Sequence, residues 1–472
     1  MAGVKNTEKT ADDPICEGTR RLSQFPVPNH EFRRASHAFA LLGALRKGET
    51  WLRIFTYALF LSAAVSIAGI SASIILLYAA VLYHGRRQPG WEHLPVWIVA
   101  AFLFLPAAAV ISALANPDPL GNLLPLRKEF GIFLPLALVP VLALVNRRRL
   151  LLTLMVPLVV MAAYAVIQHY WGVDWLRPEG KKLITSATEV GSDLFHGKGA
   201  FSHHLTFTGF MLINVPLFLA LAWKDRGRRR WIWALGAAAA AVGVAASLGR
   251  SGWFGAGIGV ILLALGFPRR VVVPLTLVVA VLGLSITVVE SGVLRKVISY
   301  ENAPGIVKRL MVTSVHRDRG RLYSWEAAWI GIRERPLLGV GYSNAADYLR
   351  AYRTTVAEKY NYTFRINLGT HTHNVYIQIL FELGIVGLVA YVYLWIAVFG
   401  WGGHWVRRAG TQFPFDSAII RGASAGLAGS MVAGIFENNF FDAEVQTMIM
   451  MAMGLILHAG LVIRNRIPSA AR

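Results

Sequence analysis

Apolar runs of 16 to 25 residues, separated by short polar segments, make up most of the chain. A helix that spans a bilayer needs about 20 mostly apolar residues. Such runs occur near 51–67, 68–83, 95–115, 130–146, 150–171, 205–223, 231–247, 252–267, 271–290, 376–400, 417–437 and 443–463. This pattern predicts an all-α polytopic integral membrane protein with about 12 transmembrane helices.

The basic residues between the runs test this count, because the cytoplasmic loops of membrane proteins carry an excess of Lys and Arg. We place the N-terminus in the cytoplasm and let each run cross the membrane once. Every basic cluster then falls on the cytoplasmic side: Arg86-Arg87, Arg147-Arg148-Arg149, Lys224 to Arg230, Arg269-Arg270, Arg407-Arg408 and Arg464 with Arg466. Reading 51–83 as a single helix would place every later cluster outside. The pattern therefore predicts that both termini are cytoplasmic.

This topology divides the chain into two polar ends, two groups of spans and a long external loop. A cleaved secretory signal is not expected, because the first long apolar run begins only at Trp51. The predicted segments are a cytoplasmic tail with a basic amphipathic helix at 31–47 (1–50), transmembrane helices 1–9 (51–290), a periplasmic loop (291–375), transmembrane helices 10–12 (376–463) and a cytoplasmic tail (464–472).

The composition agrees with a membrane protein. Only 15% of residues are charged and 55% are hydrophobic, which excludes an ordinary cytosolic enzyme, a disordered chain and a fibrous fold. The formal net charge of +21 does not imply nucleic-acid binding, because cytoplasmic loops account for such an excess. The single cysteine, Cys16, excludes a disulfide framework, a Cys-rich zinc cluster and a Cys-based redox pair within one chain.

The predicted periplasmic loop, 291–375, is basic. It holds thirteen Lys or Arg residues against six acidic residues, a net charge of +7. Such a surface attracts anions such as phosphates or acidic lipid headgroups, although a solvated loop could also be basic by chance. Within it, 321–335 predicts an amphipathic helix that lies at the membrane interface or caps the bundle. Its apolar residues at helical spacing are Leu322, Trp325, Trp329 and Ile332.

The stretch 369–387 is the strongest candidate for chemistry, because His373-Asn374 directly precedes an apolar span. Histidine is the side chain most easily tuned to act as a base near neutral pH. Two alternatives remain for His373: a structural helix cap, and a metal pair with His371. The metal pair is disfavoured, because no carboxylate or cysteine stands at ligand spacing. For His196, His203 and His204, near the other long external segment, we expect a core or interface role.

Two arginines stand out by their position. Arg250 occupies a tight external turn between two apolar spans, and Arg321 begins the amphipathic helix. A guanidinium group suits phosphate oxygens, although either residue could instead be an interface anchor. Carboxylates are nearly absent from the span interiors, which argues against an ion-coupled transporter. Glu382, Glu437 and Asp442 lie only near span ends, and we expect a structural role for Glu382.

Three motifs together resemble the O-antigen ligases and the wider ligase and polymerase superfamily. His373-Asn374, followed after nine residues by Gly384-Ile385-Val386-Gly387, is similar to the ligase signature H-[NSQ]-x9-G-x-x-G. Arg321 and Trp325, followed by P-L-L-G-V-G at 336–341, resemble a superfamily arrangement. The segment 247–252, S-L-G-R-S-G, resembles the external arginine turn, with Gly249 in place of the usual serine. The resemblance covers roughly 195–460.

The resemblance implies a membrane glycosyltransferase at the outer face of the inner membrane of a Gram-negative bacterium. The donor would be O-antigen polysaccharide on undecaprenyl pyrophosphate, and the acceptor a sugar hydroxyl of the lipid A–core. No nucleotide, metal or other cofactor is expected, and nucleic acid is not a partner. His373 would be the general base of an inverting displacement, and Arg250 and Arg321 would bind and neutralise the pyrophosphate. Asn374 and Tyr376 would contribute hydrogen bonds near the base.

Other functions share part of this pattern. An O-antigen polymerase, or a transferase that passes the glycan to a protein serine, would use the same chemistry with another acceptor. A flippase for lipid-linked glycans would bind similar molecules without catalysis. It would be expected to line its core with charged residues, which the spans lack.

Overall fold

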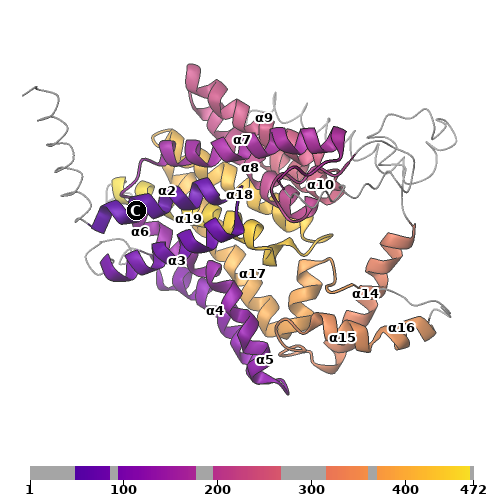
Figure 1. Ribbon diagram of the computed structural model, residues 1–472. Coiled ribbons are helices and arrows are strands. Elements are labelled where there is room, and N and C mark those ends of the chain that lie inside the picture. Colours follow the sequence, from indigo (N-terminus) through magenta and orange to yellow (C-terminus); the bar gives the residue numbers. More distant parts are fainter. Residues whose placement is uncertain (1–47, 85–93, 177–194, 267–314, 360–368, 468–472) are drawn as a thin grey trace, which may run out of the picture. The chain divides into compact units, whose positions relative to one another are not determined.

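The structure is a computed structural model that describes residues 48–84, 94–176, 195–266, 315–359 and 369–467, in which every regular element is a helix (Figure 1). Contacts divide the chain into two units, Met1–Trp51 and Leu52–Arg472. Of the first unit only Gly48–Trp51 is described, as the start of helix α2. The amphipathic helix predicted at 31–47 and the span predicted at 271–290 lie outside the described residues.

The helices follow the predicted runs closely. In chain order they are α2 (Gly48–Ser62), α3 (Ile67–His84), α4 (Val96–Leu114), α5 (Pro119–Leu123), η3 (Leu124–Phe133), α6 (Leu134–Val141), α7 (Arg147–Trp171), α8 (His204–Lys224), α9 (Arg228–Ala246), α10 (Arg250–Ala264), α14 (Val315–Glu334), α15 (Ala345–Ala351), α16 (Arg353–Lys359), α17 (Val375–Ala409), α18 (Pro414–Ala433), η5 (Asn439–Phe441) and α19 (Ala443–Arg466).

Six of the described helices are long and apolar enough to cross a bilayer: α3, α4, α7, α8, α17 and α19. Helix α10 is apolar but shorter. The prediction of an all-helical, multi-pass membrane protein is thereby confirmed, while the count of twelve stays a prediction. One predicted span differs, because 130–146 contains the end of the 3-10 helix η3, the eight-residue helix α6 and a turn. Pro135 and Pro140 lack the backbone N–H groups that a continuous helix there would use.

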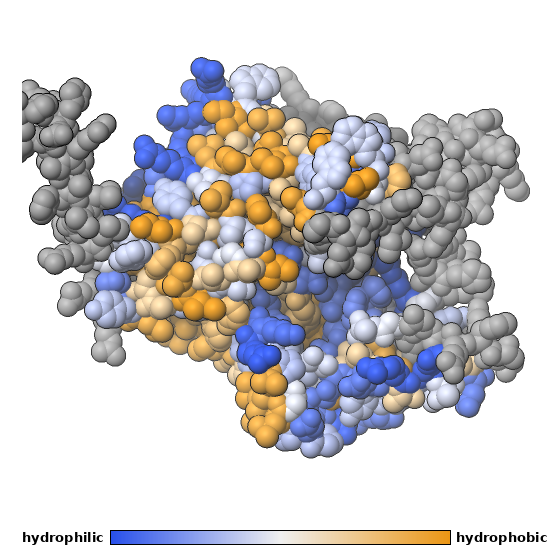
Figure 2. All heavy atoms as spheres, viewed as in Figure 1, coloured by the Kyte–Doolittle hydropathy of each residue, from blue (hydrophilic) through white to orange (hydrophobic). Residues whose placement is uncertain are grey.

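Helices α8 and α19 form the centre of the bundle. In their most apolar stretches 89% and 94% of residues are buried, against 33% in α3. The outer helices present large apolar side chains outwards, among them Leu82, Val160 and Ile396. Figure 2 shows apolar surface over the bundle, whereas polar residues gather over α14, α15 and α16. An apolar exterior of this kind is suited to lipid.

Helices α14, α15 and α16 pack around a small core of their own. Its buried members include Ala328, Ile332, Leu349 and Val356, and Phe381 of α17 completes it. Helix α14 confirms the helix predicted at 321–335. Leu322 and Trp329 are exposed, however, at 56% and 48%, so only part of the predicted apolar face enters this core.

Helix α17 is broken at Gly384, whose φ of 65° and ψ of −166° are not helical. A break inside an apolar bundle leaves backbone groups that must find other partners. The segment 336–341 supplies them. The N–H groups of Ile385 and Val386 donate to the carbonyls of Pro336 (2.9 Å) and Leu337 (3.3 Å).

Hydrogen bonds also run from N–H groups of the segment 336–341 to carbonyl groups of α17. The N–H groups of Val340 and Gly341 donate to the carbonyls of Phe381 (2.9 Å) and Glu382 (3.1 Å). Ser112 of α4 donates its hydroxyl to the carbonyls of Leu338 and Glu382. The G-x-x-G and P-L-L-G-V-G motifs are therefore two halves of one structural unit, which joins the 315–359 part to the bundle.

Gly384→Ala is expected to destabilise the protein by roughly 3 kcal/mol, because its backbone conformation is one that glycine alone adopts readily. A Cβ there would also lie 2.2 Å from the Leu337 carbonyl oxygen. Gly400→Ala is the control in the same helix, where a Cβ meets nothing within 4 Å. The measurement is denaturation of the purified variants in detergent, and equal stability of the two would contradict this account.

Candidate active site

The candidate site lies where four helices begin. His203 is the N-cap of α8, Arg250 is the first residue of α10, Asn374 is the N-cap of α17, and Asp442 is the N-cap of α19. The hydroxyl of Thr206 in α8 donates to Asp442 over 2.7 Å. Because a helix N-terminus carries a partial positive charge and unpaired N–H groups, such a grouping favours anions.

A buried carboxylate, Glu437, joins two of the predicted site residues. It lies in the turn between α18 and η5, and its side chain is only 4% exposed. Arg321 donates from Nη2 to Oε1 over 2.6 Å, and Nδ1 of His373 lies 3.4 Å from Oε2. An ionised carboxylate can only accept, so this contact is a hydrogen bond when Nδ1 of His373 carries the proton, and in the neutral ring Nε2 is then the acceptor. The structure thus brings Arg321 and His373 together.

Asn374 and Tyr376 fasten the start of α17 to the chain that leads to Glu437. Asn374 accepts from the N–H groups of Tyr376 (2.9 Å) and Ile377 (3.0 Å), which is a helix cap, and it donates to the carbonyl of Ile435 (2.9 Å). The hydroxyl of Tyr376 donates to the carbonyl of Met431 over 2.8 Å. These contacts hold the His373 and Glu437 segments together, and a substrate contact by either side chain stays a prediction.

Arg250 follows a tight turn that packs against α8. Gly249 approaches that helix closely, since a Cβ there would lie 3.1 Å from Oγ1 of Thr208. This close approach favours glycine where the motif usually has serine. The carbonyl of Ser247, in the same turn, lies 2.9 Å from Nδ1 of His196. The turn that leads into Arg250 therefore packs against α8 near Thr208.

His203 connects that turn with the pair formed by His373 and Glu437. Burial lowers the pKa of His203, Glu437 partly offsets this effect, and His373 and Lys198 lower the pKa further. His203 is therefore close enough to Glu437 and His373 for their charges to act on its pKa. The rings of His196 and His204 stack with centroids 4.0 Å apart, and the core or interface role expected for them stays a prediction.

His371 packs against His373, with ring centroids 4.1 Å apart. Burial lowers the pKa of His371 to about 4, and the neighbouring His373 acts in the same direction. His371 is therefore neutral at physiological pH. In the described part of the chain, no group of three or more His, Cys, Asp or Glu side chains has an arrangement that could hold a metal ion.

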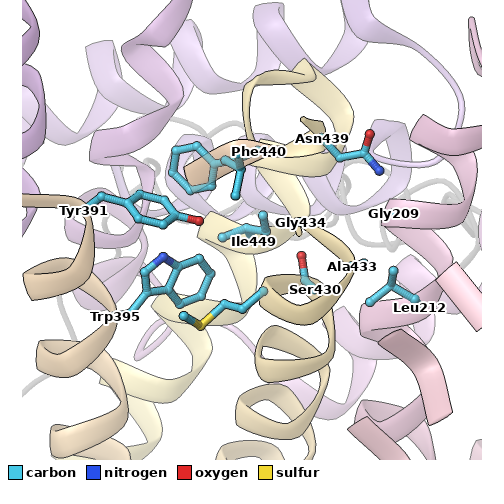
Figure 3. Close-up of a pocket in the computed structure, with 12 residues that line it drawn as sticks. Gly209, Leu212, Tyr391, Trp395, Ser430, Ala433, Gly434, Asn439, Phe440 and Ile449 are labelled. Carbon is cyan, nitrogen blue, oxygen red and sulfur yellow. The ribbon is translucent and has the colours of Figure 1, made fainter. Parts of the chain in front are cut away.

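A small cavity lies between α8, α17, α18 and α19 (Figure 3). Tyr391, Trp395 and Phe440 line one side of it, and Ser430 lines another. No predicted site residue lines this cavity. Val375, the first residue of α17, and Gly434 line the cavity, so it adjoins the segments that carry His373 and Glu437.

Sequence reasoning missed the role of Glu437. It noted this residue only as one of three carboxylates near the ends of predicted spans. Glu437 lies 64 residues from His373 and 116 from Arg321 along the chain. A carboxylate at the end of the apolar run 417–437 was the available signal, but nothing in the spacing showed which residues it meets.

The comparisons with known proteins agree with the motifs. A family model described as O-antigen ligase matches residues 235–392. A curated O-antigen ligase of Salmonella typhimurium is 39% identical over 71 residues, which cover 15% of this chain and 17% of that protein. The resemblance to the O-antigen ligase family is confirmed. The matched family segment contains Arg250, Arg321 and His373, whereas Glu437 lies beyond it.

The stability of the protein should depend on pH through His371. Its pKa is about 4 in the folded protein and 6.5 in its ordinary state, so below pH 6.5 the unfolded chain binds more protons. Stability is therefore lost as the pH falls from 6.5 towards 4. We expect the melting temperature in detergent to fall less between pH 7 and pH 5 in His371→Asn than in the wild type. Equal falls would show that His371 does not contribute.

Proposed function

We propose that this protein is an O-antigen ligase. It transfers O-antigen polysaccharide from undecaprenyl pyrophosphate to a sugar hydroxyl of the lipid A–core, by a metal-independent inverting displacement. The observation that carries the proposal is the buried Glu437 carboxylate, which contacts both His373 and Arg321. The confirmed family resemblance supports the choice of substrates, which are lipid-linked O-antigen as donor and lipid A–core as acceptor.

His373 acts as the general base in this reaction. Its Nε2 takes the proton of the acceptor hydroxyl as that oxygen attacks the anomeric carbon. Glu437 holds the Nδ1–H, fixes the ring orientation and stabilises the imidazolium that forms, as buried carboxylates do for catalytic histidines elsewhere. Base catalysis of this kind typically contributes about 10²–10⁴-fold.

Arg321 and Arg250 act on the leaving group. As the new glycosidic bond forms, the bond between the anomeric carbon and the pyrophosphate oxygen breaks, and its electron pair stays on the pyrophosphate. A guanidinium group can meet this charge with two parallel hydrogen bonds. The N-termini of α8, α10, α17 and α19 add partial positive charge on the same side. Asn374 and Tyr376 complete the substrate-binding residues of the proposal.

The proposed site faces the periplasm, at the outer surface of the inner membrane, with both termini in the cytoplasm and the spans and loop divided as predicted. Support comes from the opposite ends of the helices. There Arg147 pairs with Asp416, and Arg148 with Asp225 over 3.0 Å. Basic residues at those ends fit the cytoplasmic side.

Reconstitution with purified components tests this function. Vesicles that contain the protein, the lipid-linked donor and lipid A–core should yield the glycosylated product without another protein or nucleotide. Transfer to a second carrier-linked glycan would indicate a polymerase, and transfer to a protein serine would indicate a protein glycosyltransferase. Movement of the donor without transfer would indicate a flippase.

The two arginines give a second test. Arg321→Lys and Arg250→Lys keep the positive charge but lose the planar guanidinium group that can form two parallel hydrogen bonds. We expect each to reduce transfer about tenfold or more, with normal membrane insertion. His373→Ala should remove most of the transfer while donor binding remains. Wild-type rates in the two lysine variants would make these arginines interface anchors.

Glu437→Gln is expected to reduce kcat by about 10²-fold, because the amide cannot stabilise the imidazolium. Asp347→Asn is the matched control. That carboxylate lies in α15, its side chain is 75% exposed, and it pairs with Arg350. The measurement is kcat of both variants in the reconstituted system. Equal activity of both variants would remove Glu437 from the mechanism.

A further inference from the structure

The peptide group that joins Thr372 and His373 is held at both of its polar ends. Its carbonyl oxygen accepts a hydrogen bond from the indole Nε1–H of Trp325 over 2.8 Å. Its N–H donates to Nδ1 of His371 over 3.3 Å. One contact comes from α14 and the other from the loop that precedes α17, so two separate parts of the chain fix the plane of a single peptide group.

The orientation of this peptide group sets the backbone torsion of His373. That residue has φ of 52°, in the left-handed region that only a few per cent of residues other than glycine adopt, with Asn, Asp and His the commonest among them. Relaxation of φ to an ordinary value would rotate the peptide plane and break both contacts. Strain of this kind persists only where the surroundings over-determine it.

Thr372 itself is immobilised by its own contacts. It is fully buried, its N–H donates to Oε1 of Gln378 over 2.9 Å, and its hydroxyl donates to the carbonyl of Asn374 over 2.9 Å. The start of α17 thus holds Thr372 in place. The indole of Trp325 adds a contact from α14.

Helix α14 presents two residues to the same place. Arg321 and Trp325 are four positions apart and lie on one face of the helix. Arg321 reaches the carboxylate that contacts the His373 ring, and Trp325 reaches the peptide group before the His373 backbone. Docking of α14 therefore acts on both the side chain and the main chain of His373.

We propose that Trp325 is a positioning residue, which acts with His371 to lock the strained backbone of His373 and aim its ring at the acceptor. This inference rests on the proposed function, in which His373 is the base. His371 fits its part because it is neutral and its Nδ1 accepts the hydrogen bond. The R-x3-W motif then has two roles: Arg321 neutralises the charge of the pyrophosphate, and Trp325 fixes the backbone conformation of His373.

The test is Trp325→Phe, which keeps an aromatic ring and removes the Nε1–H. We expect kcat for reconstituted transfer to fall about tenfold, with KM for the donor unchanged because Arg321 stays in place. Trp329→Phe is the control, the same substitution one turn further along α14 at a side chain that is 48% exposed, and it should leave the rate unchanged.

A double-mutant cycle separates positioning from general packing. If Trp325 acts only through His373, Trp325→Phe should have no further effect on the residual transfer of His373→Ala. An equal fall in both backgrounds, or a rise in donor KM together with the fall in kcat, would show loosening of α14 and overturn the proposal.

Variants at His371 test the other end of the peptide group. His371→Asn offers an oxygen at the position of Nδ1 and should retain most of kcat, whereas His371→Leu should lose about tenfold. Equal loss in both would contradict the proposal. Full activity of His373→Ala would instead refute the base itself, whereas loss in His373→Ala with wild-type rates in Trp325→Phe and His371→Leu would refute only the positioning role.

Discussion

The arrangement of this protein depends on one constraint, which is that backbone polar groups inside an apolar bundle must be hydrogen-bonded. The break at Gly384 frees such groups in the middle of α17, and the segment 336–341 satisfies them. This pairing ties the 315–359 part to the bundle. Because α14 directly precedes that segment, the same pairing determines where Arg321 and Trp325 can reach.

Charge is the second organising element. Glu437 is almost completely buried, and a buried carboxylate is tolerated only with partners that offset its lost hydration. Arg321 and His373 are those partners. The contact that stabilises Glu437 is therefore also the contact that orients the proposed base, and the stability of the turn and the chemistry of the site share one interaction.

Much of the architecture could be predicted from the sequence, because bilayer thickness and hydrogen bonding leave an apolar run little choice but a helix. The boundaries of α7, α8 and α19 follow their runs within a few residues. The run 130–146 did not fold as predicted, because it is divided between the 3-10 helix η3, the short helix α6 and a turn, and hydropathy does not report where a helix begins or ends. The motifs also pointed to Arg250, Arg321 and His373, whose roles stay predictions, and the resemblance they indicated is confirmed over residues 235–392.

The sequence by itself determined that the chain is a helical membrane protein and which short motifs it carries, because both are local properties of composition and spacing. Only the tertiary structure decided that G-x-x-G and P-L-L-G-V-G form one unit, that Glu437 joins Arg321 to His373, and that Trp325 holds the peptide group before His373. These contacts span 41 to 116 residues of chain. No local pattern encodes them, since they arise from how the starts of separate helices are packed together.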